Sequence, residues 1–391
     1  MKKVKVLMLT SSYPLGENIS GPFIKTIAEG LVQKGIDVKV MMFSAAGKYK
    51  KKKDEGITVI EYPYSLLLPP ALHKHRGLIP SIKNSMYAKI ELPLYLIHTF
   101  YYLNKIPKKD YDVVHAHWYV PSGFIAALAK GLTKKPLITT AWGAEFHLPK
   151  NTIIKKILNF VNRRSDVKVT VSEYMKSKAK DYKIDMKDII IIPNAVNTKD
   201  FTAEKRKHEK IIIATMRRFV PEKRIQDIIK AISLLPMNIK SKIKVWLIGD
   251  GPEKERLVKL TNDLELNNII TFLGMVPHED IASLLQEIDI YVNPSIQEGM
   301  ATANLEAMAA GVCPVATQGV GNDEVIANGQ TGFLYPPKDV SCLADILKRL
   351  ISNKELRIEC AKRSVKVIKN NFSQQKVTDL YIKEYQSLIN L

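Results

Sequence analysis

The sequence predicts two successive α/β domains, each built around a parallel sheet with helices on both faces. Short apolar runs alternate with segments of helical periodicity along the chain, which is typical of parallel strands joined by crossover helices. The alternation stops at a turn-rich stretch, residues 193–200, and a charged run that ends at Lys210, and it then starts again. A length of 391 residues also exceeds one ordinary core and suits two domains.

The apolar runs of the first half are expected to form the first sheet, and they cover residues 4–10, 36–43, 112–116, 137–140 and 167–171. The corresponding runs of the second half cover residues 211–215, 244–248, 269–272, 290–292 and 314–316. We therefore place the domain boundary near residue 195. Neither half carries Gly-x-Gly-x-x-Gly after its first strand, which disfavours a dinucleotide-dependent dehydrogenase.

The three cysteines argue against a disulfide framework or a zinc site, because their number is odd and they form no paired motif. We expect free thiols in a reducing compartment. The first ten residues do not suit a signal peptide, because Lys5 interrupts a short apolar run. No apolar stretch reaches the roughly 18 residues that a spanning helix needs, so we expect a soluble or peripheral protein.

The net charge of +20 is unevenly distributed, with +17 in residues 1–200 and +3 in residues 201–391. This excess predicts an anionic partner for the first half: a membrane surface, a phosphorylated acceptor or nucleic acid. No recognisable nucleic-acid-binding module accompanies the charge, so we rank nucleic acid last and expect no such partner.

Two carboxylates, Glu298 and Glu306, stand seven residues apart and indicate a ligand site. Glu298 follows an apolar strand and a loop, whereas Glu306 lies in a helix-forming segment that Gly311 ends. A helix that begins near Thr302 directs its free N–H groups and its positive dipole end toward the neighbourhood of Glu298. This combination suits a ligand that carries both a phosphate and several hydroxyls.

Basic side chains and glycines follow the first two strands predicted for the second half. Arg218 and Lys223 could clamp a diphosphate, although a solvated basic loop would look the same. Gly249 and Gly251 allow a ligand to approach the backbone closely. We expect the side chain of Glu253, like that of Asp250, to cap the next helix.

Three polar side chains of the first half follow strands and are candidates for the same ligand crevice: His117, Glu145 and His147. For each of them a structural hydrogen bond explains the residue at least as well as a catalytic role. Gly21, on the loop after the first strand, is a candidate for close backbone approach.

Several of these motifs agree in order and spacing with the family 4 glycosyltransferases. The second half resembles the donor domain of that retaining family closely over residues 189–391, and the first half resembles it more loosely. The matching stretches are residues 20–23, 115–118, 171–174, 193–197, 218–223, 249–256, 272–278, 298–306 and 329–334.

The resemblance implies the GT-B fold, an α/β architecture of two Rossmann-like parallel-sheet domains that face a central cleft. Residues 1–193 would form the N-terminal acceptor-binding domain and residues 194–370 the C-terminal donor-binding domain. Residues 371–391 would form a C-terminal helix that crosses back and packs on the N-terminal domain.

The resemblance also implies roles for individual residues. Arg218 and Lys223 would hold the donor diphosphate without a metal ion, Glu298 a hydroxyl of the donor sugar, and Glu306 the ribose. The remaining donor-binding residues would be Gly21, Gly249, Gly299, Met300, Ala301, Thr302 and Ala303, of which Thr302 and Ala303 meet the phosphate. The implied catalytic set is Glu298, Arg218, Lys223, His147 and His117.

The implied reaction is transfer of a hexose or N-acetylhexosamine from a UDP- or GDP-sugar with retention, giving an α-linkage. Three residues depart from the family pattern. Trp142 stands where a sugar-facing His is usual, Arg217 replaces a Gly, and Arg224 replaces another Gly. The loss of the His leaves a non-catalytic relative that binds nucleotide sugars or glycans as the alternative.

Residues 62–109 suggest where the acceptor binds. They combine tyrosines and basic residues, with an apolar helical stripe at Met86, Ile90, Leu94, Ile97 and Tyr101. Such a surface suits an anionic membrane, although a helix that packs on its own sheet would show the same stripe. We expect peripheral docking on the inner face of the cell membrane and a saccharide acceptor that is lipid-linked or a glycolipid of a cell-surface glycan pathway.

Overall fold

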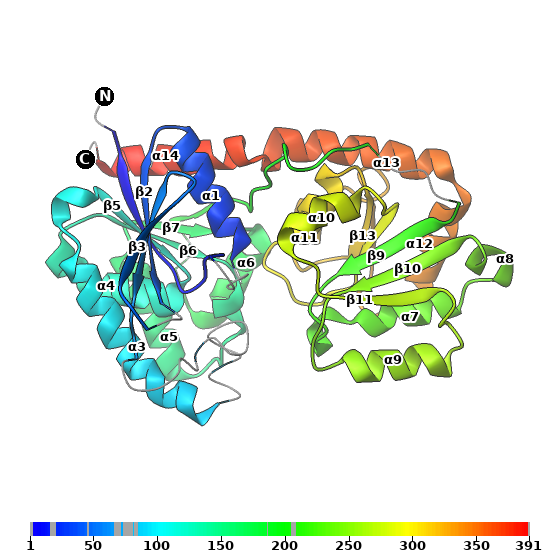
Figure 1. The fold of residues 1–391 in the computed structure, drawn as a ribbon, viewed down its shortest axis with the longest axis horizontal. Coiled ribbons are helices and arrows are strands. Elements are labelled where there is room, and N and C mark those ends of the chain that lie inside the picture. Colours follow the sequence, from blue (N-terminus) through cyan, green and yellow to red (C-terminus); the bar gives the residue numbers. More distant parts are fainter. Residues whose placement is uncertain are drawn as a thin grey trace. The chain divides into compact units, whose positions relative to one another are not determined.

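The computed structural model describes residues 3–15, 21–44, 47–65, 72, 81, 85–185, 187–204 and 209–389. The chain divides into two compact units, Met1–Pro193 with Val377–Leu391, and Asn194–Lys376. Each unit contains one sheet with helices on both faces (Figure 1). The two Rossmann-like parallel sheets expected from the sequence are therefore confirmed.

The sheet of the first unit has the strand order β3-β4-β2-β1-β5-β6-β7-β8 among the described residues. Its strands are parallel except for β3, which pairs antiparallel with β4. They are β1 (Lys5–Leu9), β2 (Asp37–Phe43), β3 (Lys50–Asp54), β4 (Ile57–Tyr62), β5 (Val113–His117), β6 (Leu137–Ala141), β7 (Val167–Thr170) and β8 (Ile189–Ile191). All five runs predicted for this sheet form strands.

Strands β3, β4 and β8 were not predicted. For β3 the reason is that its lysines show no apolar side chain to bury. Residues 50–53 are four consecutive exposed lysines. The strand is held by pairing with the buried β4 instead of by burial of its own side chains. An edge position suits such a sequence, since edge lysines discourage pairing with another chain.

The helices of the first unit are α1 (Pro22–Gln33), α3 (Met86–Lys105), α4 (Phe124–Thr133), α5 (Thr152–Arg164) and α6 (Glu173–Ala179), together with most of the C-terminal α14 (Gln374–Ile389). Helix α14 packs on this unit through the buried Val377, Tyr381 and Tyr385. The hydroxyl of Tyr385 lies 2.7 Å from Nδ1 of the buried His115. The helix that was expected to cross back to the N-terminal domain does so.

The second sheet has the order β11-β10-β9-β12-β13-β14 in the described chain, and all its neighbours are parallel. Its strands are β9 (Ile211–Met216), β10 (Ile243–Ile248), β11 (Ile270–Gly274), β12 (Ile290–Asn293), β13 (Cys313–Thr317) and β14 (Phe333–Tyr335). Its helices are α7 (Ile225–Ser233), α8 (Met237–Lys240), α9 (Lys254–Asp263), α10 (His278–Leu285), α11 (Thr302–Ala309), α12 (Val340–Ser352) and α13 (Lys354–Val367). The five predicted runs are again strands, and among the described residues β14 is the one strand of this sheet that was missed.

Gly249 and Gly251 let the loop after β10 lie directly against the loop after β9. A Cβ on Gly249 would lie 1.8 Å from the carbonyl oxygen of Arg217, and one on Gly251 would lie 2.4 Å from that of Phe219. The φ angle of Gly249, 136°, also belongs to the region that favours glycine. The structure therefore gives these glycines a packing role, and their contact with a ligand stays a prediction.

The expected capping of α9 by the carboxylate of Glu253 is wrong. Glu253 occupies the N-cap position, but its side chain accepts no cap hydrogen bond and pairs with Arg256 instead. The Asp250 carboxylate accepts a hydrogen bond from the N–H of Gly251, at 2.7 Å.

Within the described residues, no helix is long and apolar enough to cross a membrane. The three cysteines are free thiols.

Substitution of Gly249 by Ala should destabilise the second unit by about 3 kcal/mol, since backbone strain and a backbone clash act together. Gly274→Ala is the matched control: Gly274 also has a positive φ, 71°, but no atom lies within 4 Å of its virtual Cβ. It should lose only about 1 kcal/mol. Scanning calorimetry of both variants measures the difference, and equal losses would contradict the packing role.

Candidate functional site

The carboxylate of Glu298 is the centre of the candidate site in the second unit. Lys223, at the end of the short turn Pro221–Lys223, donates to Oε1 of Glu298 at 2.8 Å and to the carbonyl of Gln297 at 3.0 Å. A terminal nitrogen of Arg217 lies 3.2 Å from the same Oε1. The loop after β9 thus supplies two cations to one carboxylate on the loop after β12.

This carboxylate is ionised at neutral pH despite its burial. Glu298 is 9% exposed. Burial by itself raises the pKa of its carboxyl, but the charges of Arg217 and Lys223 outweigh burial and lower the pKa to about 2. The site therefore holds a fixed negative charge between two positive ones.

The chain segment that follows Glu298 is held by Asn194. The amide nitrogen of the Asn194 side chain donates to the carbonyl of Met300 at 2.8 Å and to Oγ1 of Thr302 at 3.1 Å. Helix α11 begins at Thr302, and no side-chain cap occupies its start in the described chain. Its first N–H groups, which no helical turn satisfies, are left for another acceptor.

Glu306 lies inside α11 and is also buried. Its Oε1 lies 2.9 Å from Nε2 of His278, the first residue of α10. The predicted helix start near Thr302 and the helix end before Gly311 are confirmed. The structure thus brings Glu298, Lys223, the start of α11 and Glu306 to the carboxyl-end side of the second sheet, where open parallel sheets bind ligands.

Arg218 and Arg217 differ from the expectation. The sequence analysis assigns the diphosphate to Arg218 and treats Arg217 as a departure from the family pattern. In the structure Arg218 is exposed and makes no ion pair with any described residue, whereas the Arg217 side chain is 9% exposed and contacts Glu298. An exposed Arg218 remains available to a ligand, and its role stays a prediction. A charged residue directly after a buried strand was the signal for Arg217.

The candidate residues of the first unit gather around aromatic rings. His117 is fully buried at the end of β5, and its ring stacks on that of Trp142, with 5.7 Å between centroids. The ring of Phe23 packs against that of Trp142, with 4.5 Å between their centroids. Both ring nitrogens of His117 lack a hydrogen-bond partner among the described residues. Burial and the adjacent His115 lower the pKa of His117, so the ring is neutral.

Glu145 fixes the backbone of two loops. Its carboxylate accepts from the N–H of Tyr119 at 2.9 Å and from the N–H of Gly143 at 3.0 Å. Burial raises the pKa of Glu145 to about 7, although these backbone donors oppose the rise. These contacts support a structural hydrogen-bonding role for Glu145, which the sequence analysis weighed against a catalytic one.

Two further predicted residues of the first unit can be placed only in part. Gly21 precedes α1 with a φ of 81°, and a Cβ there would lie 2.7 Å from the carbonyl oxygen of Ser12. The backbone of His147 ends the turn Ala144–His147, and its side chain lies outside the described part of the structure.

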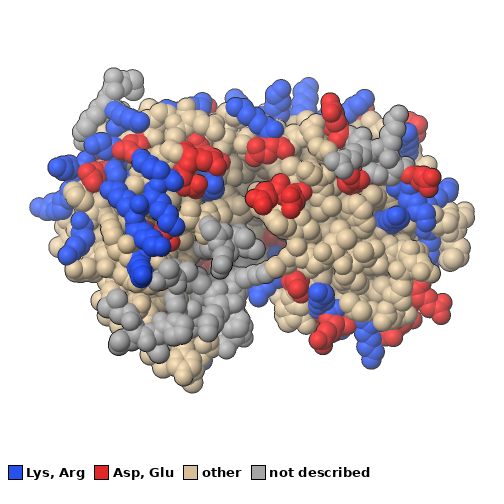
Figure 2. Space-filling view, viewed as in Figure 1, with Lys and Arg blue, Asp and Glu red and all other residues tan. Residues whose placement is uncertain are grey.

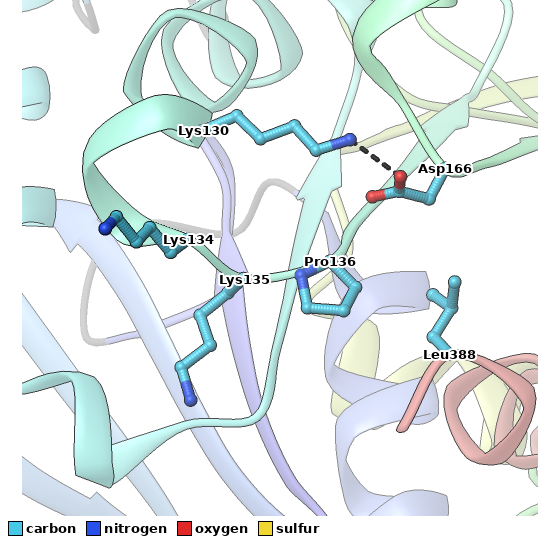
Figure 3. A pocket seen from close by; sticks show the side chains of 6 residues that line it. All are labelled: Lys130, Lys134, Lys135, Pro136, Asp166 and Leu388. Atoms are coloured by element: carbon cyan, nitrogen blue, oxygen red, sulfur yellow. Dashed lines mark hydrogen bonds and ion pairs between the residues drawn. The ribbon is translucent and has the colours of Figure 1, made fainter. Parts of the chain in front are cut away.

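A separate hollow of about 330 Å³ lies at the opposite, amino-end side of the first sheet (Figure 3). It is lined by Lys130, Lys134, Lys135, Pro136, Asp166 and Leu388. Asp166 accepts from Nζ of Lys130 and from the N–H of Leu137, both at 2.7 Å. The carboxylate in this hollow is thus already satisfied, and the strand polarity places the hollow at the end of the first sheet opposite to His117, which ends β5.

Among the described residues, no group of three or more His, Cys, Asp or Glu side chains could hold a metal ion.

Comparison with protein families matches both halves of the chain. Residues 196–367 match the family described as Glycosyl transferases group 1. Residues 21–200 match the family described as Glycosyltransferase Family 4. Together the two matches include the candidate residues of both units.

Individual relatives agree with these matches. The chain is 27% identical over 295 residues to the N-acetyl-alpha-D-glucosaminyl L-malate synthase of Bacillus anthracis, which covers 72% of this chain and 76% of that one. It is 24% identical to the putative teichuronic acid biosynthesis glycosyltransferase TuaC of Bacillus subtilis, over 98% of this chain and 99% of the relative. The solved structure of Anabaena Alr3699/HepE in complex with UDP superposes with a TM-score of 0.76 at 18% identity, over 98% of this chain and 100% of that one.

The raised pKa of Glu145 predicts a pH dependence of stability. The folded protein keeps a proton on Glu145 that the unfolded chain, with a pKa near 4.5, has lost, so this residue's contribution to stability falls as the pH rises from about 4.5 to about 7. Glu145→Gln should flatten that fall, whereas Glu55→Gln, an exposed glutamate of the same unit, should not. Denaturant unfolding at pH 5 and pH 7 tests this, and an unchanged slope in Glu145→Gln would contradict it.

Proposed function

Because the chain belongs to the glycosyltransferases of group 1 and family 4, it is an enzyme that transfers a sugar from a nucleotide sugar, and we propose that it moves a hexose or N-acetylhexosamine from a UDP-sugar, with a GDP-sugar as the second choice. The UDP in the Alr3699/HepE structure and the glucosaminyl group in the name of the Bacillus anthracis relative favour this choice.

One observation carries the proposal: a buried, ionised glutamate lies between two cations beside an uncapped helix start. Nζ of Lys223 is 2.8 Å from Glu298, and α11 begins four residues after that carboxylate. Departure of a nucleoside diphosphate builds negative charge on its outer phosphate. Lys223, the exposed Arg218 and the first amides of α11 are the groups that would stabilise it, without a metal ion.

The sugar would be held by Glu298 and by the amides near Gly299, Met300 and Ala301, and the ribose by Glu306. A carboxylate that two cations already neutralise is a poor nucleophile, so we propose no covalent intermediate on Glu298. The acceptor oxygen attacks the anomeric carbon on the face from which the diphosphate leaves, and its proton passes to the leaving phosphate oxygen. This course retains the configuration and gives an α-linkage.

The acceptor is proposed to be a lipid-linked saccharide or a glycolipid of a cell-surface glycan pathway. The name of the Bacillus subtilis relative, which refers to teichuronic acid biosynthesis, supports this class. The surface of the first unit supports it independently. The whole stripe of α3 faces solvent, with Met86 69%, Ile90 58%, Leu94 42%, Ile97 62% and Tyr101 48% exposed.

The opposite face of α3 packs on the unit, so packing on the sheet does not explain the stripe. The buried residues of the helix are Ala88, Glu91, Tyr95, Thr99 and Leu103. Lysines lie beside the stripe: Lys105 sits 4.7 Å above the Tyr101 ring, and the exposed Tyr49, next to the lysines of β3, stacks on Tyr102. Figure 2 shows lysines gathered over β3. We propose that this face docks on anionic lipid at the inner face of the cell membrane.

A non-catalytic relative that only binds nucleotide sugars is the second candidate. The observation that favours it is Trp142, whose ring covers His117 where the family usually has a sugar-facing histidine. Turnover of a nucleotide sugar separates the two candidates.

Glu298→Ala and Lys223→Ala should each lower sugar transfer or donor hydrolysis at least about 100-fold, since each removes a charge from the donor site. The assay uses radiolabelled UDP- and GDP-sugars with and without a chelator, which should leave the rate unchanged. Lys348→Ala and Glu355→Ala, exposed residues of the same unit, serve as controls. Donor binding without turnover by the wild-type protein would favour the non-catalytic candidate, and full activity in both site variants would exclude the proposed donor site.

The docking proposal predicts that Ile90→Glu with Ile97→Glu lowers the protein bound to vesicles rich in anionic lipid by about tenfold, because two apolar contacts are lost and two repulsive charges are added. Met237→Glu changes an even more exposed apolar side chain of the other unit and should have no effect. Co-sedimentation at low salt measures binding. If wild-type protein ignores these vesicles, the proposed docking is wrong.

A further inference from the structure

We propose that Arg217 is a positioning residue that frees Lys223 for the donor diphosphate by holding Glu298 when Lys223 turns to the ligand. The inference rests on the proposed function and concerns a residue that departs from the family pattern.

Arg217 contacts both ends of the segment that is proposed to hold the donor. One terminal nitrogen lies 3.2 Å from Oε1 of Glu298, and the other donates to Oδ1 of Asn304 at 3.4 Å. Residues 298–304 include the amides assigned to the sugar and the phosphate. A planar guanidinium suits such a bridge, because its donors point in fixed directions.

Asn304 is itself firmly placed. It is buried, and its side chain accepts from Nδ2 of Asn293 at 3.0 Å and donates to Oδ1 of Asn322 at 2.8 Å. Asn322 in turn donates to the carbonyl of Thr317 at 2.8 Å. The far end of the Arg217 bridge is therefore a side chain that is itself anchored to strands β12 and β13, which favours a guanidinium that stays in place when Lys223 turns toward a ligand.

The Glu298 carboxylate and a diphosphate would compete for the ammonium of Lys223, and Arg217 lessens this competition. That ammonium lies 2.8 Å from Oε1 of Glu298 and also bonds the carbonyl of Gln297. A buried carboxylate that loses its cation is strongly destabilised, so with Lys223 as the sole partner the ion pair would compete with the diphosphate. Arg217 is a second cation on the same oxygen, and it remains there when Lys223 leaves.

The Arg217 guanidinium is enclosed by the protein. Its Nε is buried and has no hydrogen-bond partner among the described residues. The guanidinium also lies beside the Tyr291 side chain, which is buried, so its other donors are surrounded by protein atoms.

The test is the binding of UDP and GDP to R217M, with the same measurement on R217M combined with E298Q. In R217M, Lys223 stays paired with Glu298, so nucleoside diphosphate affinity should fall about tenfold relative to the wild type. E298Q removes the charge that retains Lys223, so the double variant should recover UDP or GDP affinity to within about threefold of the wild type. It should not recover binding of the sugar part, which needs the carboxylate.

A merely structural role for Arg217 would give a different result, since a second substitution beside it would not restore binding. Equal losses in R217M and in the double variant, or unchanged affinity in R217M, overturn the proposal. R217Q, alone and with E298Q, makes the same comparison if R217M does not fold. R363M removes an exposed arginine of the same unit and should bind as the wild type does. If the wild-type protein binds neither UDP nor GDP and none of the corresponding nucleotide sugars, the proposed function itself fails, which is a distinct outcome.

Discussion

The structure of the second unit depends on one buried charge, the carboxylate of Glu298. An ionised carboxylate is costly to bury unless cations and donors surround it, so its burial requires Arg217 and Lys223 at one oxygen. This requirement ties the loop after β9 to the loop after β12. The adjoining loop after β10 can then approach only where glycines stand, because Gly249 lies against the carbonyl of Arg217. Charge and backbone packing thus fix the same small region.

In the first unit the candidate residues carry little charge and the charged side chains lie on the surface, in contrast to the buried charge of the second unit. Burial lowers the pKa of His117 and raises that of Glu145, and the ring of Trp142 stacks on that of His117. The surface of the first unit carries the charge, with the exposed lysines of β3 on the same unit as the exposed stripe of α3. A dry interior and a basic, partly apolar exterior suit a unit that meets an acceptor at a lipid surface. Residues 201–391 carry a net charge of only +3 and show no such excess.

Most of the apolar strands were predicted, because burial on both faces of a parallel sheet leaves continuous apolar runs, as in β1 and β9. The apolar strands β4, β8 and β14 were missed. Strand β3 was also missed, since its stability comes from pairing with β4 and its lysines carry no such signal. The helix start at Thr302 was predictable from local composition. The contrast between Arg217 and Arg218 was not, because adjacent residues on a loop point in directions that only the packing of Gly249 and Asn304 decides.

By itself, the sequence determined the two parallel sheets, most of their strands, the glutamate pair and the basic loop near it, because these follow from local periodicity and motif spacing. The tertiary structure alone decided which cation holds Glu298, that Glu145 binds two backbone N–H groups, and that the stripe of α3 faces solvent. The physical reason is that burial and ion pairing join residues distant in sequence: 81 positions separate Arg217 from Glu298, and no local pattern records which side chains meet.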